Sequence, residues 1–300
     1  MPQDLATNGN MITAAFKRQF HDTFEVKCQQ MTSALQGGVE DRGAISGASF
    51  TINDMGSVEM QASGDRFGDT TWSVPDAGSR LCVMQDFDLF VPIEPRDGPK
   101  LSADPTSKYM QLCLAAEQRQ RDRMIYKALG GSIQRKTADG ETYVATTLPS
   151  AQKIAASASP MNKAKLARAR KLFRKNQCDN LNLYMLYNSD MLEQILVDKE
   201  LTQWDKQTIQ AIQDGDVEKK WGGFIWVPYE DFAEFTDANA TVKTGYAFAQ
   251  GAVHFGRNSI SNFDIATRAD KKNVRQIGGI TSYGAGRGNE QKVVQIDFVV

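Results

Sequence analysis

One long predicted helix constrains the fold of this chain more than any other feature of the sequence. Asp104 and Pro105 are typical of a helix start, and Gly130-Gly131 end the pattern. A helix of about 25 residues is ~37 Å long. The residues at its middle are all polar or charged: Glu117-Gln118-Arg119-Gln120-Arg121-Asp122-Arg123. Such a helix suits contact with solvent or with another subunit, held by charge pairs, better than burial in a small core.

The segment 45–84 predicts a long β-hairpin that lacks a core of its own. Residues 57–62 and 71–74 alternate apolar and polar side chains, and the residues between them are rich in turn formers. An isolated hairpin with so few apolar residues is marginally stable in water. It therefore needs another surface to lie on, either its own domain or another chain.

The segment Ile12 to Leu35 is predicted to form one amphipathic helix. Its apolar residues recur at steps of four and three, with charged residues opposite, and Gly37-Gly38 end it. Two interpretations stay open for this helix. It packs on the chain's own core, or it is an N-terminal arm lying on a neighbouring subunit.

After residue 181 the pattern becomes α/β, and after about residue 262 it is rich in β-structure. Ser189 is predicted to cap a helix that runs through Leu196, and a second helix is predicted from Thr202 to Ile212. A hairpin is predicted around Thr137 to Gly140. Strands are predicted at 181–187, 223–227, 242–249, 264–268, 274–280 and 293–300. The fold class is therefore α+β.

Charge is balanced over the chain but not along it. There are 35 Lys and Arg against 36 Asp and Glu, which excludes a globally basic nucleic-acid binder. No acidic residue occurs between Glu141 and Asp179, where a helix is predicted from Met161 to Gln177. Its basic residues are Lys163, Lys165, Arg168, Arg170, Lys171, Arg174 and Lys175. They form either a solvated face or a contact with a polyanion or an acidic partner.

Residues suited to catalysis or metal binding are sparse. The two histidines, His21 and His254, form no metal motif, and the four cysteines show no CxxC spacing. Gly284 to Gly288 precede a strand pattern, so they predict a turn or hinge rather than a phosphate cradle. Asp86 and Asp88 fit a solvated strand face. We expect no enzymatic activity, no cofactor, no metal, no membrane span and no secretory signal.

The order of these elements, with several short motifs, resembles the major capsid proteins of tailed double-stranded DNA bacteriophages, the Hong Kong 97 fold family. The motifs lie along nearly the whole chain, and their order carries more weight than any one of them. They are Ile12 to Phe20, Gln29-Gln30, Asp69-Thr70, Arg80, Asp86-Phe87-Asp88, Ala115 to Asp122, Tyr187 to Leu192 and Gly222-Gly223-Phe224.

The resemblance implies a layout of four parts. They are an N-terminal arm (1–44), an extended loop that lies over the adjacent subunit (45–84), a peripheral domain with a spine helix at 105–129 (85–178 and 259–300), and an inserted axial domain (179–258). It also implies contacts between subunits, which we assign to Phe16, Phe20, Phe24, Arg66, Phe67, Asp69, Trp72, Arg119, Arg121 and Arg123.

The function implied is a structural one, without enzymatic activity. Copies of the chain would assemble into hexamers and pentamers of an icosahedral head in the host bacterial cytoplasm. The implied partners are a separate scaffolding protein, a portal protein, a cement protein and packaged double-stranded DNA, the last with the basic helix at 161–177 as a candidate contact. An encapsulin-type compartment of the same fold is the alternative. Some relatives crosslink their shells through a lysine of the extended loop. No lysine occurs between Lys27 and Lys100, so the resemblance implies a shell without such crosslinks.

Overall fold

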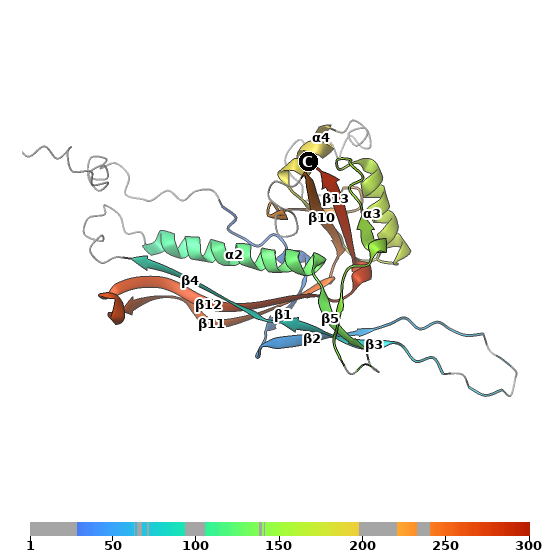
Figure 1. Ribbon diagram of the computed structural model, residues 1–300, viewed down its shortest axis with the longest axis horizontal. Helices are drawn as coiled ribbons and strands as arrows, with labels where there is room; N and C mark the ends of the chain where they lie inside the picture. Colours follow the sequence, from blue (N-terminus) through green and yellow to red (C-terminus); the bar gives the residue numbers. More distant parts are fainter. Residues whose placement is uncertain are drawn as a thin grey trace, which may run out of the picture. The chain divides into compact units, whose positions relative to one another are not determined.

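Figure 1 shows the computed structural model of the chain, which describes residues 29–62, 64, 68–70, 72–93, 106–137, 140, 142–197, 221–232 and 241–300. The fold is α+β, as predicted, with three sheets and three α-helices among these residues. They form two compact units. One unit comprises the described residues of 29–33, 86–121 and 258–282, and the other comprises those of 34–85, 122–257 and 283–300.

The strands are β1 (Glu40–Ala44), β2 (Ser49–Met55), β3 (Ala77–Val83), β4 (Gln85–Ile93), β5 (Ile133–Thr137), β6 (Val144–Thr146), β7 (Lys153–Ile154), β8 (Leu183–Tyr187), β9 (Ile225–Pro228), β10 (Val242–Ala249), β11 (Val253–Arg268), β12 (Val274–Arg287) and β13 (Val293–Val299). The α-helices are α2 (Thr106–Gly130), α3 (Lys163–Lys175) and α4 (Ser189–Val197). Short 3-10 helices are η1 (Gln36–Gly38), η3 (Ser150–Gln152), η5 (Ala269–Lys271) and η6 (Glu290–Lys292).

The five-stranded sheet has the order β7-β13-β10-β8-β9 and contains much of the apolar core. β10 pairs antiparallel with β13 from Val242↔Val299 to Phe248↔Val293, and β7 pairs parallel with the other edge of β13. β13 is therefore an internal strand of the sheet that also holds β8, β9 and β10. The predicted layout places β10 in the axial domain (179–258) and β13 in the peripheral domain (259–300). The two strands nevertheless pair in one sheet, because strands distant in sequence can be neighbours in space.

Helix α3 packs against β13 and β7, as its amphipathic pattern requires. Its apolar side chains Leu166, Ala169 and Phe173 are buried, and Phe173 makes an edge-to-face contact with Phe224. The side chain of Asn162 accepts a hydrogen bond from the Lys165 N–H at 3.0 Å and caps the helix. Asn188 caps α4 in the same way, accepting from the Met191 N–H, whereas the sequence had suggested Ser189.

Helix α2 ends at Gly130, as predicted, while its predicted capping residues lie outside the described part. Its polar middle does not simply face outward. Asp122 is fully buried, and its carboxylate accepts hydrogen bonds from the N–H groups of Ala34 at 2.9 Å and Leu35 at 3.3 Å. No described helix is long and apolar enough to cross a membrane.

The predicted N-terminal helix is wrong at its C-terminal end. Residues 29–35 form no α-helix, and the short η1 follows them. The physical reason is the hydrogen bonding of Ala34 and Leu35, whose N–H groups bind the Asp122 carboxylate instead of carbonyls one helical turn back. Residues 12–28 of the prediction lie outside the described part of the chain.

A second sheet has the order β2-β3-β5-β6 and carries the predicted hairpins. β2 and β3 pair antiparallel from Ser49↔Val83 to Met55↔Ala77, and β5 pairs with β6 around the predicted turn. The described residues of 57–62 and 72–74 are not strands, although their sequence alternates. We call the segment 56–76 the β2–β3 connection; Figure 1 shows it leaving the ends of these two strands.

Gly284 and Gly286 do not form the turn or hinge that the sequence suggested, because β12 continues through Arg287 and only Gly288 lies in a bend after it. They allow a close approach between strands. A Cβ atom on Gly286 would stand 2.0 Å from the Cys82 sulfur, and one on Gly284 would stand 2.6 Å from the Met84 sulfur. A side chain is therefore excluded at these positions by packing rather than by backbone conformation.

We expect Gly286→Ala to lower the free energy of unfolding by about 1–3 kcal/mol, the usual cost of forcing extra atoms into a packed core. Urea denaturation followed by tryptophan fluorescence measures the change. Cys82→Ala in the same chain removes the closest atom and should recover part of the loss. Equal stability of Gly286→Ala and the parent chain would contradict the packing argument.

Candidate functional site

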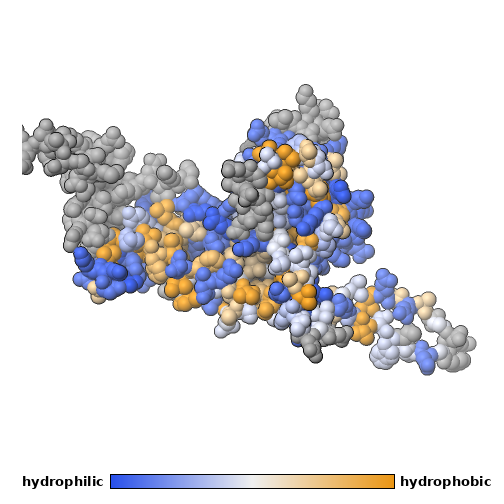
Figure 2. All heavy atoms as spheres, viewed as in Figure 1, coloured by the Kyte–Doolittle hydropathy of each residue, from blue (hydrophilic) through white to orange (hydrophobic). Residues whose placement is uncertain are grey.

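The β2–β3 connection exposes apolar side chains that nothing in the described chain covers. Met60 is 102% exposed, and Trp72 and Val74 are each 86% exposed. Figure 2 shows apolar residues distributed along this segment among polar ones. A hydrogen bond from the Gly56 N–H to the Asp76 carbonyl, at 2.6 Å, closes its base. A group of exposed large apolar side chains marks a surface that another molecule covers.

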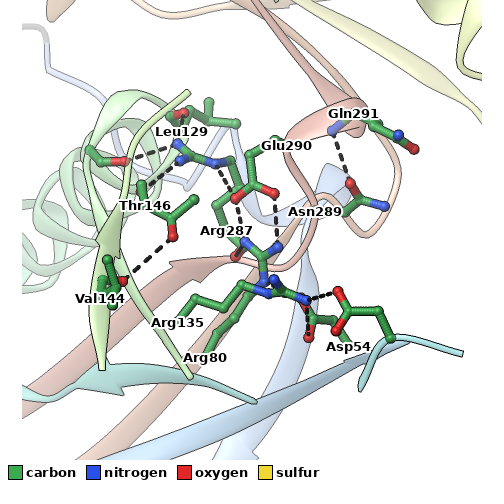
Figure 3. A network of polar contacts seen from close by, with 12 residues as sticks. Asp54, Arg80, Leu129, Arg135, Val144, Thr146, Arg287, Asn289, Glu290 and Gln291 are labelled. Atoms are coloured by element: carbon green, nitrogen blue, oxygen red, sulfur yellow. Dashed lines mark hydrogen bonds and ion pairs between the residues drawn. The ribbon is translucent and has the colours of Figure 1, made fainter. Parts of the chain in front are cut away.

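A network of charged side chains lies at the base of this connection (Figure 3). Arg80 of β3 is its centre and is 4% exposed. Its guanidinium donates to Asp54 of β2 at 2.9 Å and makes a two-pronged contact with the Glu290 carboxylate of η6. Two parallel N–H···O bonds between a guanidinium and a carboxylate are strong and directional. The network thus fixes β2 and β3 to the turn before β13.

Asp54 holds a second arginine beside the first. Arg135 of β5 is the register partner of Arg80, and its guanidinium donates to Asp54 at 2.8 Å and to Asp76 at 3.2 Å. Two cations side by side on one sheet face would repel without the carboxylate between them. Gly78 leaves room for it, because a Cβ there would stand 2.5 Å from an Asp54 oxygen.

Arg287 extends the network to the end of α2. Its side chain is fully buried, and its guanidinium donates to the carbonyls of Leu129 and Gly131, both at 2.9 Å. Carbonyls at a helix C-terminus lack partners inside the helix, and a cation there is favourable. Its Nε lies 3.6 Å from Glu290. Glu290 therefore joins β3 to the end of α2 through two arginines.

The surroundings of the two carboxylates favour their ionised form. Burial alone would raise the pKa of Glu290, but hydrogen bonds and the charge of Arg80 outweigh it and hold that pKa below its ordinary value. The pKa of Asp54 is lowered in the same way by Arg135 and Arg80, again against burial. The arrangement ties β2, β3, β5 and η6 together at the base of the β2–β3 connection.

The three predicted contact arginines of α2 all have partners within the chain. Arg119 donates to the Gln29 side chain at 2.7 Å, Arg121 to Glu117 at 2.7 Å, and Arg123 to Asp231 at 2.6 Å. The side chain of Arg121 is only 13% exposed. Their assignment to contacts between subunits stays a prediction, and these internal pairs compete with it.

The other predicted contact residues divide into two groups. Asp69 and Trp72 lie in the β2–β3 connection and are exposed. Five lie outside the described residues: Phe16, Phe20, Phe24, Arg66 and Phe67.

The basic residues of α3 do not form one set. Lys165 is buried, and its ammonium donates to the carbonyls of Ala156, Ser159 and Asp297 at 2.7–2.9 Å. The prediction of Lys165 as a contact for DNA or scaffold is therefore wrong, because the three N–H groups of its ammonium all donate hydrogen bonds to backbone carbonyls. Burial lowers the pKa of Lys165. Arg168, Lys171, Arg174 and Lys175 are exposed.

The network residues Arg80, Asp54 and Glu290 were missed as a site by sequence reasoning. Arg80 and Glu290 are 210 residues apart, so no local pattern joins them. Within the described residues, no group of three or more His, Cys, Asp and Glu side chains could hold a metal ion.

Comparison with known proteins gives a consistent result. A protein family described as Phage capsid protein matches residues 12–300. Curated protein sequences include no recognisable relative. Among solved structures, the capsid of Ralstonia phage GP4 matches with a TM-score of 0.65 at 11% identity, covering 94% of each chain.

Two further capsid structures match over similar lengths. The capsid of Helicobacter pylori bacteriophage KHP30 has a TM-score of 0.65 at 11% identity, covering 97% of this chain and 98% of that one. The capsid of cyanophage P-SCSP1u has a TM-score of 0.63 at 14% identity, covering 92% and 91%. At such identities the structural matches establish the fold, and the family match rests on the sequence.

Proposed function

The chain belongs to the phage capsid protein family, and from this membership we propose that its copies assemble into hexamers and pentamers of an icosahedral head that encloses double-stranded DNA. Membership makes it a structural protein of the virion capsid, not an enzyme. Self-association is inherent in that role. The observation that carries the proposal is the family match over residues 12–300, together with the uncovered apolar side chains of the β2–β3 connection.

The proposed layout is the one that the family resemblance implies. Residues 1–44 act as an arm, and the extended loop of 45–84 lies over the adjacent subunit. The long helix α2 with β4, β11 and β12 belongs to a peripheral domain, while β8, β9 and β10 belong to an axial domain around the capsomer axis. The pairing of β13 with β10 favours counting β13 with the axial domain, in place of the limits 179–258.

The β2–β3 connection is proposed to bind the neighbouring subunit through its apolar side chains. Each such side chain gains about 1.5–3 kcal/mol when it moves fully from water into an apolar contact. The charged network at its base would keep the connection in one direction before the neighbour arrives. Less conformational freedom then has to be lost on assembly.

The remaining partners are proposed from the same role. They are a separate scaffolding protein during assembly in the host bacterial cytoplasm, a portal protein at one vertex, and a cement protein on the shell.

We expect a shell without isopeptide crosslinks from this loop, because no lysine occurs between Lys27 and Lys100. Particles boiled in denaturing buffer should release a single band near 33.2 kDa in gel electrophoresis. A ladder of multiples of this mass would contradict the lysine argument. Reducing agent in a parallel lane excludes disulfides between chains as the cause of any ladder.

Imaging of the purified full-length chain, expressed alone, tests the proposed function. Negative-stain electron microscopy with mass photometry should show closed shells, tubes, or rings of five and six subunits. Coexpression with the scaffolding gene of the same phage is the second arm. Only monomers or dimers in both arms would overturn the proposal. Closed shells filled with one host protein instead of nucleic acid would favour the encapsulin-type alternative.

A further inference from the structure

The solvent-facing side of helix α3 is a surface of cations and alanines. The helix turns about 100° per residue, so Arg168, Lys171, Arg174 and Lys175 fall within one sector of about 120°. Ala164 and Ala167 occupy the same sector and are exposed. Figure 2 shows hydrophilic residues over this part of the molecule. We call these four basic residues the α3 cation face.

The α3 cation face is separate from the packing of the helix. Leu166, Ala169 and Phe173 point into the core, and Lys165 is bound by three backbone carbonyls. Asp179 is a nearby carboxylate, 3.8 Å from Arg174 and 3.6 Å from Arg170, which also donates to the Gly223 carbonyl. The side chain of Arg174 is nevertheless 82% exposed, so this pair leaves it accessible.

The residue types on this face indicate whether its acidic partner is a protein or a nucleic acid. Protein interfaces are anchored by buried aromatic or aliphatic side chains, and charged residues are depleted from their centres. The α3 cation face offers no such anchor, since every large apolar side chain of the helix is wholly or partly buried. Contacts to phosphate need only Lys and Arg, and double-stranded DNA presents a negative charge about every 1.7 Å of its axis.

We propose that the α3 cation face binds the phosphate backbone of double-stranded DNA, without recognition of base sequence. Arg168 and Lys175 are about 10 Å apart along the helix axis, a length over which the duplex carries about six phosphates. The proposal rests on the proposed function, because a shell protein of a DNA phage meets a duplex at high concentration inside the head. It places α3 on the genome side of the shell.

The test is binding, measured by anisotropy, of a fluorescent 30-base-pair duplex of mixed sequence to unassembled subunits of the purified full-length chain, separated from shells by gel filtration. One variant carries Arg168→Gln, Lys171→Gln, Arg174→Gln and Lys175→Gln. A control variant carries Lys153→Gln, Arg257→Gln, Lys271→Gln and Arg275→Gln, which removes two lysines and two arginines that are exposed elsewhere. Circular dichroism of both variants confirms that the helices are retained.

We expect the control to bind like the parent chain and the α3 variant to lose at least tenfold in affinity. If about four phosphates are contacted, raising salt from 50 to 200 mM should weaken parent binding about 100-fold, and the α3 variant should show a much smaller salt effect. A second duplex of unrelated sequence should bind equally well.

Three results would overturn the proposal: equal duplex binding by the α3 and control variants, no duplex binding by the parent chain, or binding of polyglutamate in place of the duplex. The last would assign the face to an acidic protein such as a scaffold. Each can occur while the parent chain still forms shells in the electron microscope, so the DNA contact and the capsid role fail independently.

Discussion

A chain that lacks residues 56–74, with Met55 and Pro75 joined through Asn-Gly, is expected to fold as a subunit but to form no closed shells. The folded core should survive because the β2–β3 pairing ends at Met55↔Ala77, before the deleted residues begin. The charged pair of Asp54 and Arg80 lies within the retained strands. Assembly should fail because the exposed apolar side chains, Trp72 among them, are then absent. Negative-stain images and mass photometry measure the shells, and thermal unfolding measures the subunit.

A second variant separates the length of the connection from its chemistry. Serine in place of Val58, Met60, Trp72 and Val74 retains the length and removes the exposed large apolar side chains of the connection. We expect it to assemble at least tenfold less efficiently than the parent chain, because burial of these side chains is the proposed source of affinity. Normal shells from the deletion variant would contradict the role of the connection. Normal shells from the serine variant alone would assign that role to its backbone.

Arg80→Met is expected to lower the free energy of unfolding by about 3–5 kcal/mol, the cost of removing one partner from a buried ion pair. Glu290 would lose its two-pronged partner and Asp54 one of its two arginines, although Arg287 stays near Glu290 and Arg135 still reaches Asp54. Chemical denaturation measures the loss. Arg80→Met with Glu290→Met should cost less than the two single changes added together, since the double change removes both members of the Arg80–Glu290 pair and each single change leaves one of them behind.

The same network should make stability depend on acid pH. Both carboxylates have folded pKa values below their unfolded ones, so their contribution is complete above pH ~4.5 and is lost as pH falls through the folded values. A Glu290→Gln variant should therefore lose less stability than the parent chain between pH 5 and pH 3. If both lose the same amount, other carboxylates govern acid unfolding and the network makes no special contribution.

Local periodicity was enough to predict the parts of this fold whose burial is decided within a single element. The core face of α3 follows from Leu166, Ala169 and Phe173 at helical spacing, and β10 coincides with its predicted span of 242–249. The end of α2 follows from Gly130-Gly131, since glycine commonly ends helices. In each case neighbouring residues in sequence supply the whole signal.

Residues whose role depends on a distant segment were predicted incorrectly or missed. Asp122 was placed in an outward-facing polar stretch, but it binds the backbone of Ala34 and Leu35. A signal for this did exist, because Asp122 shares one helix face with the buried Ile125 and Leu129. Lys165 looked like its basic neighbours, and only the fold brings the Asp297 carbonyl, 132 residues away, to its ammonium group.

The internal position of β13 determines when the subunit can finish folding. Its partners β7 and β10 are synthesised earlier. Each lacks its shared neighbour in the sheet until residues 293–299 leave the ribosome. At roughly 5–20 residues per second, the interval between Lys165 and its partner Asp297 takes roughly 7–26 s of translation. Throughout that time the growing chain has no complete five-stranded sheet. The core around this sheet is therefore completed only after residues 293–299 have left the ribosome, long after the β2–β3 connection has been made.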